Sequence, residues 1–233
     1  MSLVSAARKS NCTRHWPAHW ALTALLCSLF LAGPAEAAPE QALEREHALQ
    51  SLTHAHTLAR RQAASRLGEV GTMTDTPVLL QVLRDADAGA RENAERALWR
   101  IWERSGDLRI EKLYRTGVAQ MKSGELRRSI ATFTRVIRLK PGFAEGWNKR
   151  ATLYFLTGDY GKSLADCAEV IKRNPYHFGA LAGYGQIYLK LENYELALEY
   201  FNRAIEINPN MDGVRLNIQL LEQLLEERRR NMV

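Results

Sequence analysis

Apolar residues recur along most of this chain at the three- and four-residue spacing of amphipathic helices. From Leu108 onward the whole pattern also repeats every 34 residues, and three prolines mark the period: Pro141, Pro175 and Pro209. A tight turn is expected sixteen or seventeen residues before each proline, at Gly124, Gly158 and Asn193. Because a proline ends a helix and a turn separates two helices, each unit is predicted to hold two antiparallel helices.

Large and small side chains alternate at fixed positions of the three units 110–143, 144–177 and 178–211. The small residues, which let two helices approach closely, are Gly117, Ala151 and Gly185 at the eighth position and Ser129, Ser163 and Ala197 at the twentieth. The large residues that fill the space beside them include Leu113, Trp147, Leu181, Phe133 and Phe201. This pattern resembles the tetratricopeptide repeat (TPR) family over residues 110–211. The resemblance implies an all-α helical-repeat solenoid that binds other proteins.

Residues 38–106 carry a second, shorter periodicity. One helix is predicted from about residue 40 to residue 69, another over 78–83, and a third over 89–104. The triplet Arg61, Ala64 and Leu67 is echoed 30 residues later by Arg91, Ala94 and Ala97, with Leu98 directly after them. This pattern resembles a HEAT-like helical repeat, and an unrelated helical hairpin that caps the array is the alternative. We expect the segment to pack onto the first TPR unit as one continuous right-handed superhelix.

Residues 212–233 are predicted to form an amphipathic helix followed by a charged, hydrophilic tail. The helix is expected to cover the exposed end of the third repeat, as solenoids require. It also carries an apolar stripe of leucines at Leu220, Leu221, Leu224 and Leu225. A homo-oligomer formed through this C-terminal helix is therefore a second expectation.

The first 37 residues have the three parts of a secretory signal peptide. Arg8, Lys9 and Arg14 form a basic region, an apolar core runs over 21–32, and Ala35-Glu36-Ala37 offers small residues for cleavage. An uncleaved membrane anchor is the alternative, but the apolar core is shorter than the roughly 20 residues that a spanning helix needs. We expect cleavage after Ala37, export to a bacterial periplasm, and no stable membrane span afterwards.

Charge and cysteine content narrow the choice of partner. The net charge is +6, with acidic and basic groups interleaved, which does not favour nucleic acid as a partner. Two of the three cysteines lie in the signal segment, so the exported chain holds only Cys167 and forms no internal disulfide. Cys167 is expected to be a buried apolar residue of the repeat core.

No arrangement of catalytic, metal-binding or cofactor-binding residues stands out. His47 and His54 share a helix face, but two histidines alone bind a metal poorly. Gly183-Tyr184-Gly185 follows no strand, so packing glycines explain it better than a phosphate-binding loop. The chain is therefore predicted not to be an enzyme, and no metal or cofactor is expected.

The TPR resemblance implies a concave groove lined by the first helix of each unit, with the second, fifth, ninth and twelfth positions facing into it. The candidate partner-binding residues at these positions are Glu111, Tyr114, Val118, Met121, Glu145, Asn148, Thr152, Phe155, Gln186 and Leu189. Gly179 and Gly183 stand near the places where some family members clamp a carboxylate with Lys or Arg, so that mode is disfavoured.

The expected function is an exported protein–protein interaction scaffold, or adaptor, that binds a peptide or a helix in this groove. A self-associating structural module of the cell envelope is the first alternative. An envelope glycan binder is the second, and it is motivated only by Trp99, Trp102 and Trp147.

Overall fold

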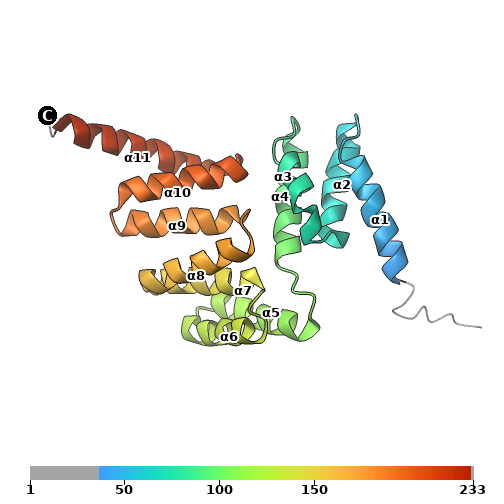
Figure 1. The fold of residues 1–233 in the computed structure, drawn as a ribbon, viewed down its shortest axis with the longest axis horizontal. Coiled ribbons are helices and arrows are strands. Elements are labelled where there is room, and N and C mark those ends of the chain that lie inside the picture. The colour runs from blue at the N-terminus through green and yellow to red at the C-terminus, as the bar shows by residue number, and fades with distance from the viewer. Residues whose placement is uncertain (1–36, 232–233) are drawn as a thin grey trace, which may run out of the picture.

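The computed structural model describes residues 37–231, which are helical and contain no strand. The N-terminal segment holds α1 (Ala37–Ser51), α2 (Thr57–Val70), the short 3-10 turn η1 (Met73–Asp75), α3 (Thr76–Val82) and α4 (Ala88–Trp102). The repeat array holds α5 (Leu108–Lys122), α6 (Leu126–Leu139), α7 (Ala144–Leu156), α8 (Tyr160–Arg173), α9 (Phe178–Lys190), α10 (Tyr194–Ile207) and α11 (Asp212–Asn231). The predicted all-α repeat fold is confirmed (Figure 1).

The repeat array consists of three antiparallel helix pairs, α5–α6, α7–α8 and α9–α10, stacked on one another (Figure 1). The small residues lie where the helices of a pair touch. A Cβ atom on Gly117 would lie 2.8 Å from the ring of Phe133, so only glycine fits there without repacking. Ser129 and Ser163 are buried, and each donates its hydroxyl to a carbonyl of the paired helix at 2.8 Å.

The turns inside the helix pairs use a left-handed backbone conformation. Gly124 and Gly158 have φ values of 78° and 79°, as the turn residues of the first two pairs. In the third pair this conformation belongs to Glu192, with φ of 57°, and not to Asn193 as the sequence suggested. Asn193 instead caps α10, because its side chain accepts the backbone N–H of Leu196.

The last helix, α11, covers the end of the array as expected. Val214, Ile218 and Leu221 are buried in the cluster that also contains Phe201 of α10. Leu221 is therefore buried in the contact between α11 and α10, and it is not available as part of the predicted apolar stripe. Leu216 and Leu220 remain 55% and 54% exposed on the same helix.

The expectation of a single helix from residue 40 to residue 69 is wrong. The chain ends α1 at Ser51 and restarts α2 at Thr57, with no glycine or proline between them to signal the break. Leu52 turns into the core at 6% exposure, and the backbone N–H of His56 bonds Nδ1 of His54 at 3.1 Å. Tertiary packing of Leu52 overrides the local helical pattern.

The core of the N-terminal segment lies between α2 and α4. Ala64 and Ala94 are fully buried, as are Leu67 and Leu98, so the echoed triplets meet at one helix–helix contact. The small alanines permit close approach and the leucines fill the space beside them. The HEAT-like classification itself stays a prediction.

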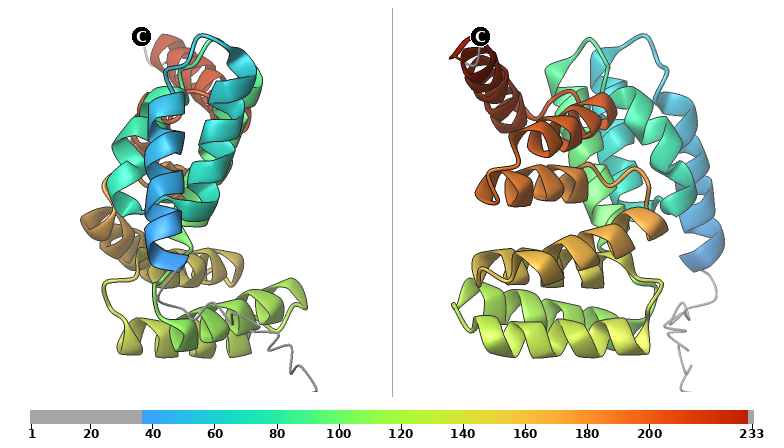
Figure 2. Two further views of the ribbon diagram at one scale, coloured as in Figure 1. Left: turned by 90° about the vertical axis from the view of Figure 1, so that its right-hand side faces the viewer. Right: turned by 60° about the vertical axis from the view of Figure 1, so that its left-hand side comes forward.

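The N-terminal segment does not continue the superhelix, so that expectation is wrong. After α4 the chain continues into α5 and α6, which lie beyond the C-terminal end of α4. The following repeats then stack in the opposite direction, so that α9 lies beside α4 (Figures 1 and 2). Phe178 of α9 is buried in the same cluster as Trp102 and Leu98. Asn210, just before α11, bonds the carbonyl of Leu83 at 2.8 Å. Folding back buries the aromatic face of α4, which end-on stacking would leave in water.

The predicted signal peptide lies almost wholly in residues 1–36, outside the part that the structure describes. Within residues 37–231, no helix combines the length and the apolar character that crossing a membrane requires.

Candidate functional site

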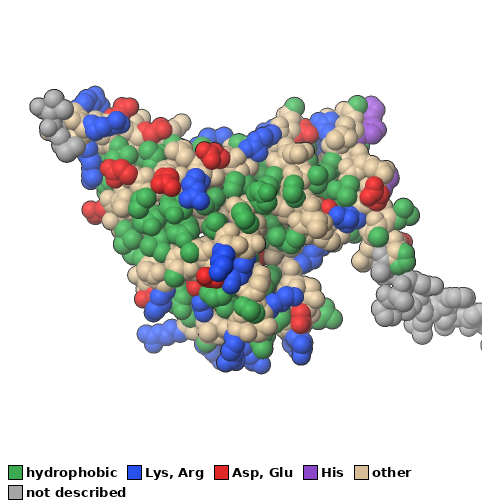
Figure 3. Space-filling model, in the orientation of Figure 1, with side chains coloured by type: hydrophobic (Ala, Val, Ile, Leu, Met, Phe, Trp, Pro, Cys, Tyr) green, Lys and Arg blue, Asp and Glu red, His purple; other side chains and the backbone are tan. Residues whose placement is uncertain are grey.

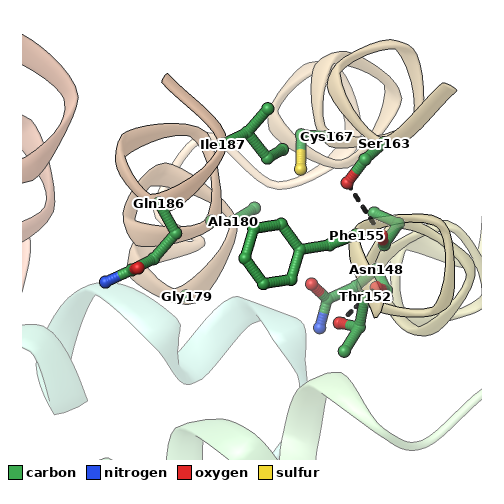
Figure 4. A pocket seen from close by; sticks show the side chains of 11 residues that line it. Asn148, Thr152, Phe155, Ser163, Cys167, Gly179, Ala180, Gln186 and Ile187 are labelled. Atoms are coloured by element: carbon green, nitrogen blue, oxygen red, sulfur yellow. Dashed lines mark hydrogen bonds between the residues drawn. The ribbon is translucent and has the colours of Figure 1, made fainter. Parts of the chain in front are cut away.

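A pocket of about 150 Å³ opens between α7 and α9, with side chains of α8 at its back (Figure 4). Its apolar surface comes mainly from Phe155, Ala180 and Ile187. Asn148, Thr152 and Gln186 supply polar groups. Figure 4 shows the ring of Phe155 reaching from α7 toward α9, with Cys167 and Ser163 behind it. An apolar hollow with a few polar groups at its edge is the usual form of a site for a peptide side chain.

Four of the predicted groove residues come together at this pocket: Asn148, Thr152, Phe155 and Gln186. The other predicted contact residues lie elsewhere. Val118 and Met121 pack on the core of the first repeat, and Leu189 packs on the core near α11. Glu111 accepts the backbone N–H of Gly106 at 3.2 Å, on the loop before α5.

Tyr114 and Glu145 are corrected from contact residues to internal ones. Tyr114 is only 6% exposed, because its ring packs on Phe133 and Phe143. Its hydroxyl donates to Glu103, at the end of α4, at 2.9 Å. Glu145 is fully buried. Neither side chain is available to touch a partner, because Phe133, Phe143 and Glu103 enclose Tyr114, and His177, Asn148 and Lys149 bond Glu145.

Glu145 and His177 form a buried hydrogen-bonded pair between the second and third repeats. Nε2 of His177 lies 2.6 Å from Oε1 of Glu145, and Nδ1 of His177 accepts the backbone N–H of Ala180 at 3.0 Å. The ring therefore carries its proton on Nε2 and donates it to the carboxylate. Burial alone raises the pKa of Glu145, but His177, Lys149 and Asn148 lower it below its usual value.

The same carboxylate orients the pocket residue Asn148. Oε2 of Glu145 accepts Nδ2 of Asn148 at 3.0 Å, which directs the amide oxygen of Asn148 away from the pair. Lys149, the next residue, lies 3.1 Å from Glu103 and 3.6 Å from Glu145. The positive charge of Lys149 is thus already matched by two carboxylates of this chain.

Trp99 and Trp102 of α4 border the N-terminal end of α9. Trp102 stacks on His177 with a centroid distance of 4.8 Å, and a Cβ atom on Gly179 would lie 2.5 Å from the ring of Trp99. Gly179 is therefore required by the close approach of α4. Both tryptophans are used in packing, as is Trp147, whose ring lies 4.6 Å from the guanidinium of Arg173. The site offers no exposed tryptophan platform for a glycan.

Sequence reasoning missed His177, Glu103 and Trp102, which hold the site together. Glu145 and His177 are 32 residues apart, and their pairing follows only from the stacking of two repeats. Glu103 and Trp102 reach the repeats only because α4 folds back. The one available signal was a pair of polar residues placed where consecutive units meet.

Cys167 lies at the back of the pocket and has no features of a reactive thiol. It is free, 3% exposed, and burial raises the pKa of its thiol to about 12. A thiol with so high a pKa holds little thiolate at neutral pH. In the described part of the chain, no group of three or more His, Cys, Asp or Glu residues is arranged to hold a metal ion.

Comparisons with known proteins agree with this architecture. Models of the tetratricopeptide repeat match residues 181–211 and 114–178. A TPR repeat-containing protein of Rhizobium etli is 30% identical over 145 residues, which cover 62% of this chain and 71% of that protein. The small glutamine-rich tetratricopeptide repeat-containing protein of Dictyostelium discoideum is 31% identical, over 49% of this chain and 34% of its own length.

Among solved structures, the Sgt2 TPR domain of Aspergillus fumigatus superposes with a TM-score of 0.50 at 22% sequence identity. The superposition covers 53% of this chain and 83% of that domain. At this identity the likeness concerns the fold.

Proposed function

The chain belongs to the tetratricopeptide repeat family, and from this premise we propose that it is a protein-interaction scaffold that binds a peptide or a helix at the α7–α9 pocket. The observation that carries the proposal is the pocket itself, which brings together Asn148, Phe155 and Gln186 from two consecutive repeats. An apolar side chain of the partner fills the hollow between Phe155 and Ile187. Burying one such side chain contributes about 1.5–3 kcal/mol.

The polar groups at the pocket fix the partner's backbone. Asn148 uses its amide N–H₂ on Glu145, and within the described residues neither its Oδ1 nor the amide of Gln186 has a side-chain hydrogen-bond partner. Asn148 therefore accepts a backbone N–H of the partner, and Gln186 either donates or accepts. Because Glu145 holds Asn148 in place, little side-chain entropy is lost on binding.

The partner segment is apolar or neutral where it crosses Asn148. Lys149 is paired with Glu103 and Glu145, so it has no unmatched charge with which to attract a carboxylate. The N-terminal half of the predicted groove is also closed, because Tyr114 is covered and bonded to Glu103. The partner therefore lies on α7 and α9.

A peptide-display selection followed by affinity measurement tests this function. Peptides selected on the wild-type protein carry one apolar anchor residue and bind with about micromolar affinity. Phe155→Ala weakens binding by at least about tenfold, and Asn148→Ala weakens it less. Leu156→Ala is the matched control, since Leu156 is the next residue, is 55% exposed and lies outside the pocket. Equal affinities for the Phe155 and Leu156 variants would reject the pocket.

The scaffold works after export, in a bacterial periplasm. The support is the basic, apolar and small-residue order of residues 1–37. Expression with the native N-terminus in a Gram-negative host, followed by fractionation and mass measurement, tests it. A periplasmic product beginning near Ala38 supports export, and an unprocessed cytosolic or membrane-bound product contradicts it.

Self-association through α11 is the second candidate, favoured by the exposure of Leu216 and Leu220. A dimer detected by light scattering that is lost in the double variant Leu216→Gln, Leu220→Gln would support it. A monomer at all concentrations of the wild-type protein would remove it.

A further inference from the structure

A second pocket, of about 190 Å³, lies where the N-terminal segment meets the loops of the repeat array. It is formed by the end of α4, the loop between α6 and α7, and the end of α8. The pocket is separate from the α7–α9 pocket and shares no lining residue with it. Its cationic lining residues are Arg104, Lys140 and Arg173, and no acidic residue lines it.

Two of these three cations have no carboxylate partner among the described residues. Arg104 donates to the backbone carbonyls of Glu69 and Gly71, the latter at 2.6 Å. Lys140 donates to the backbone carbonyl of Ser105. Arg104 is an exposed residue, but partial desolvation of its guanidinium lowers its pKa, because no carboxylate bonds to it. The hydrogen bonds use only part of the donor capacity of the two side chains, since guanidinium has five N–H groups and ammonium three.

Arg173 is the partly neutralised member of the cluster. It pairs with Glu169, four residues earlier on α8, and its Nε donates to the carbonyl of Pro141. Asp75 and Glu111 add negative charge in the wider surroundings of Arg104, but neither forms an ion pair with it in the described residues. The pocket therefore keeps an excess of positive charge.

The N-terminus of α7 adds backbone donors to the same pocket. Phe143 and Ala144 line it, and Phe143 provides no side-chain cap for the helix. The equivalent helices α5 and α9 are capped by Asp107 and His177. The first N–H groups of a helix and the positive end of its dipole attract anions.

We propose that this pocket binds a compact oxyanion, namely a phosphate group, between Arg104, Lys140 and the N-terminus of α7. Arginine provides two directed N–H donors, lysine a point charge, and the helix the backbone N–H of its first residue, Ala144, which together match the oxygens of a phosphate. The bound phosphate links the N-terminal segment to the first and second repeats. This inference does not depend on the peptide pocket.

Titration of the full-length processed protein, followed by heteronuclear NMR, tests the proposal. Inorganic phosphate and glycerol 3-phosphate are the probes, and they distinguish a free anion from a phosphate monoester; acetate tests whether a carboxylate suffices. Saturable shifts of the Gly142, Phe143 and Ala144 amides at millimolar phosphate or below are expected. Wild-type protein without such shifts would overturn the proposal, whatever the variants do.

Charge-removing variants locate the site. Arg104→Met and Lys140→Met keep the aliphatic stems, and each weakens phosphate binding by at least about tenfold, as loss of a charge-assisted hydrogen bond requires. Lys172→Met is the matched control, because Lys172 precedes Arg173 on α8 but does not line the pocket. Unchanged phosphate affinity in folded Arg104 and Lys140 variants would contradict the assignment, as would equal weakening by the Lys172 variant.

Discussion

The N-terminal segment and the repeat array are both stacks of helices, but different interactions position their helices. In the N-terminal segment, arginines on α1 and α2 reach carboxylates of the following turns: Arg45 bonds Asp75, Arg60 bonds Asp85 and Arg61 bonds Asp87. In the array, alternating small and large residues set the helix contacts, as in the meeting of Gly117 with Phe133. In the N-terminal segment these pH-dependent ion pairs add to the alanine–leucine contact of α2 and α4, whereas the contacts between paired helices of the array depend mainly on shape.

The two regions meet at Phe178, which lies in the repeat array by sequence but packs in the core of the N-terminal segment. Phe178 opens the third repeat, yet its fully buried ring contacts Trp99 and Trp102 of α4. The difference teaches that a periodic sequence pattern predicts contacts inside the period well. It does not predict what covers the edge of the array.

The largest expected effect comes from breaking this junction. Phe178→Ala lowers the free energy of unfolding by about 3–5 kcal/mol, because it removes a fully buried ring. Urea unfolding measures the loss, and hydrogen exchange is expected to show faster exchange in α4. Phe201→Ala is the matched control, since Phe201 is also fully buried but lies within the cluster shared by α10 and α11. An unchanged exchange rate in α4 of the Phe178 variant would show that the junction does not couple the regions.

A second prediction compares a buried ion pair of the N-terminal segment with an exposed one. Asp75 is 2% exposed and accepts Arg45 Nε at 2.7 Å and the backbone N–H of Thr72 at 2.7 Å. Asp75→Asn lowers the free energy of unfolding by about 1.5–3 kcal/mol, the value of hydrogen bonds to a charged group. Glu92→Gln removes an exposed pair with Arg96 and is expected to cost less than about 1 kcal/mol. Equal costs in denaturant unfolding would show that burial of Asp75 adds nothing.

Two glycines of α9 sharpen the shape argument. A Cβ atom on Gly185 would collide with the ring of Phe201, so Gly185→Ala costs about 1–3 kcal/mol in thermal or urea unfolding. At Gly183 the nearest atom is Sγ of Cys167, at 3.7 Å, an ordinary contact. Gly183→Ala therefore stabilises the protein by up to about 1 kcal/mol through helix propensity. Similar effects at the two positions would contradict packing as the determinant.

The smallest expected effect is a difference in acid sensitivity. Hydrogen bonds from Arg60 and Arg61 lower the pKa of Asp85 and Asp87, and the pKa of Asp75 is also lowered, because bonds from Arg45 and Thr72 outweigh desolvation. A depressed folded-state pKa contributes stability that is present above the unfolded pKa and is lost as pH falls through the folded one. Hydrogen exchange between about pH 5 and pH 2 is therefore expected to rise in α1–α4 before it rises in α10 and α11, which pack through the apolar cluster of Phe201, Val214 and Leu221. Simultaneous opening of both regions would contradict this order.

Most of the fold could be predicted from the sequence, because the residues that define each repeat act between neighbouring helices. The prolines, the glycine turns and the small residues Ser129 and Ser163 each act within one helix pair, so position alone predicts their neighbours. The break between α1 and α2 was missed because the burial of Leu52, and not a turn residue, causes it.

The candidate site was predicted only in part, for a physical reason. Asn148, Phe155 and Gln186 line the pocket because the helical period fixes which way they face, and their contact with a partner stays a prediction. Tyr114 and Glu145 were assigned to the same face, but both are buried: Tyr114 bonds Glu103, and Glu145 bonds His177. These pairings depend on how separate parts of the chain pack together, and the one-dimensional pattern does not record that packing.

Chemical-shift mapping with a selected peptide on the full-length protein tests the central claim most directly. The account predicts that the largest shifts fall on Asn148, Phe155, Gln186 and their neighbours on α7 and α9, with small shifts on the covered residue Tyr114. Shifts concentrated on α1–α4, or on Tyr114 and the rest of α5, would contradict the assignment of the pocket as the partner-binding site.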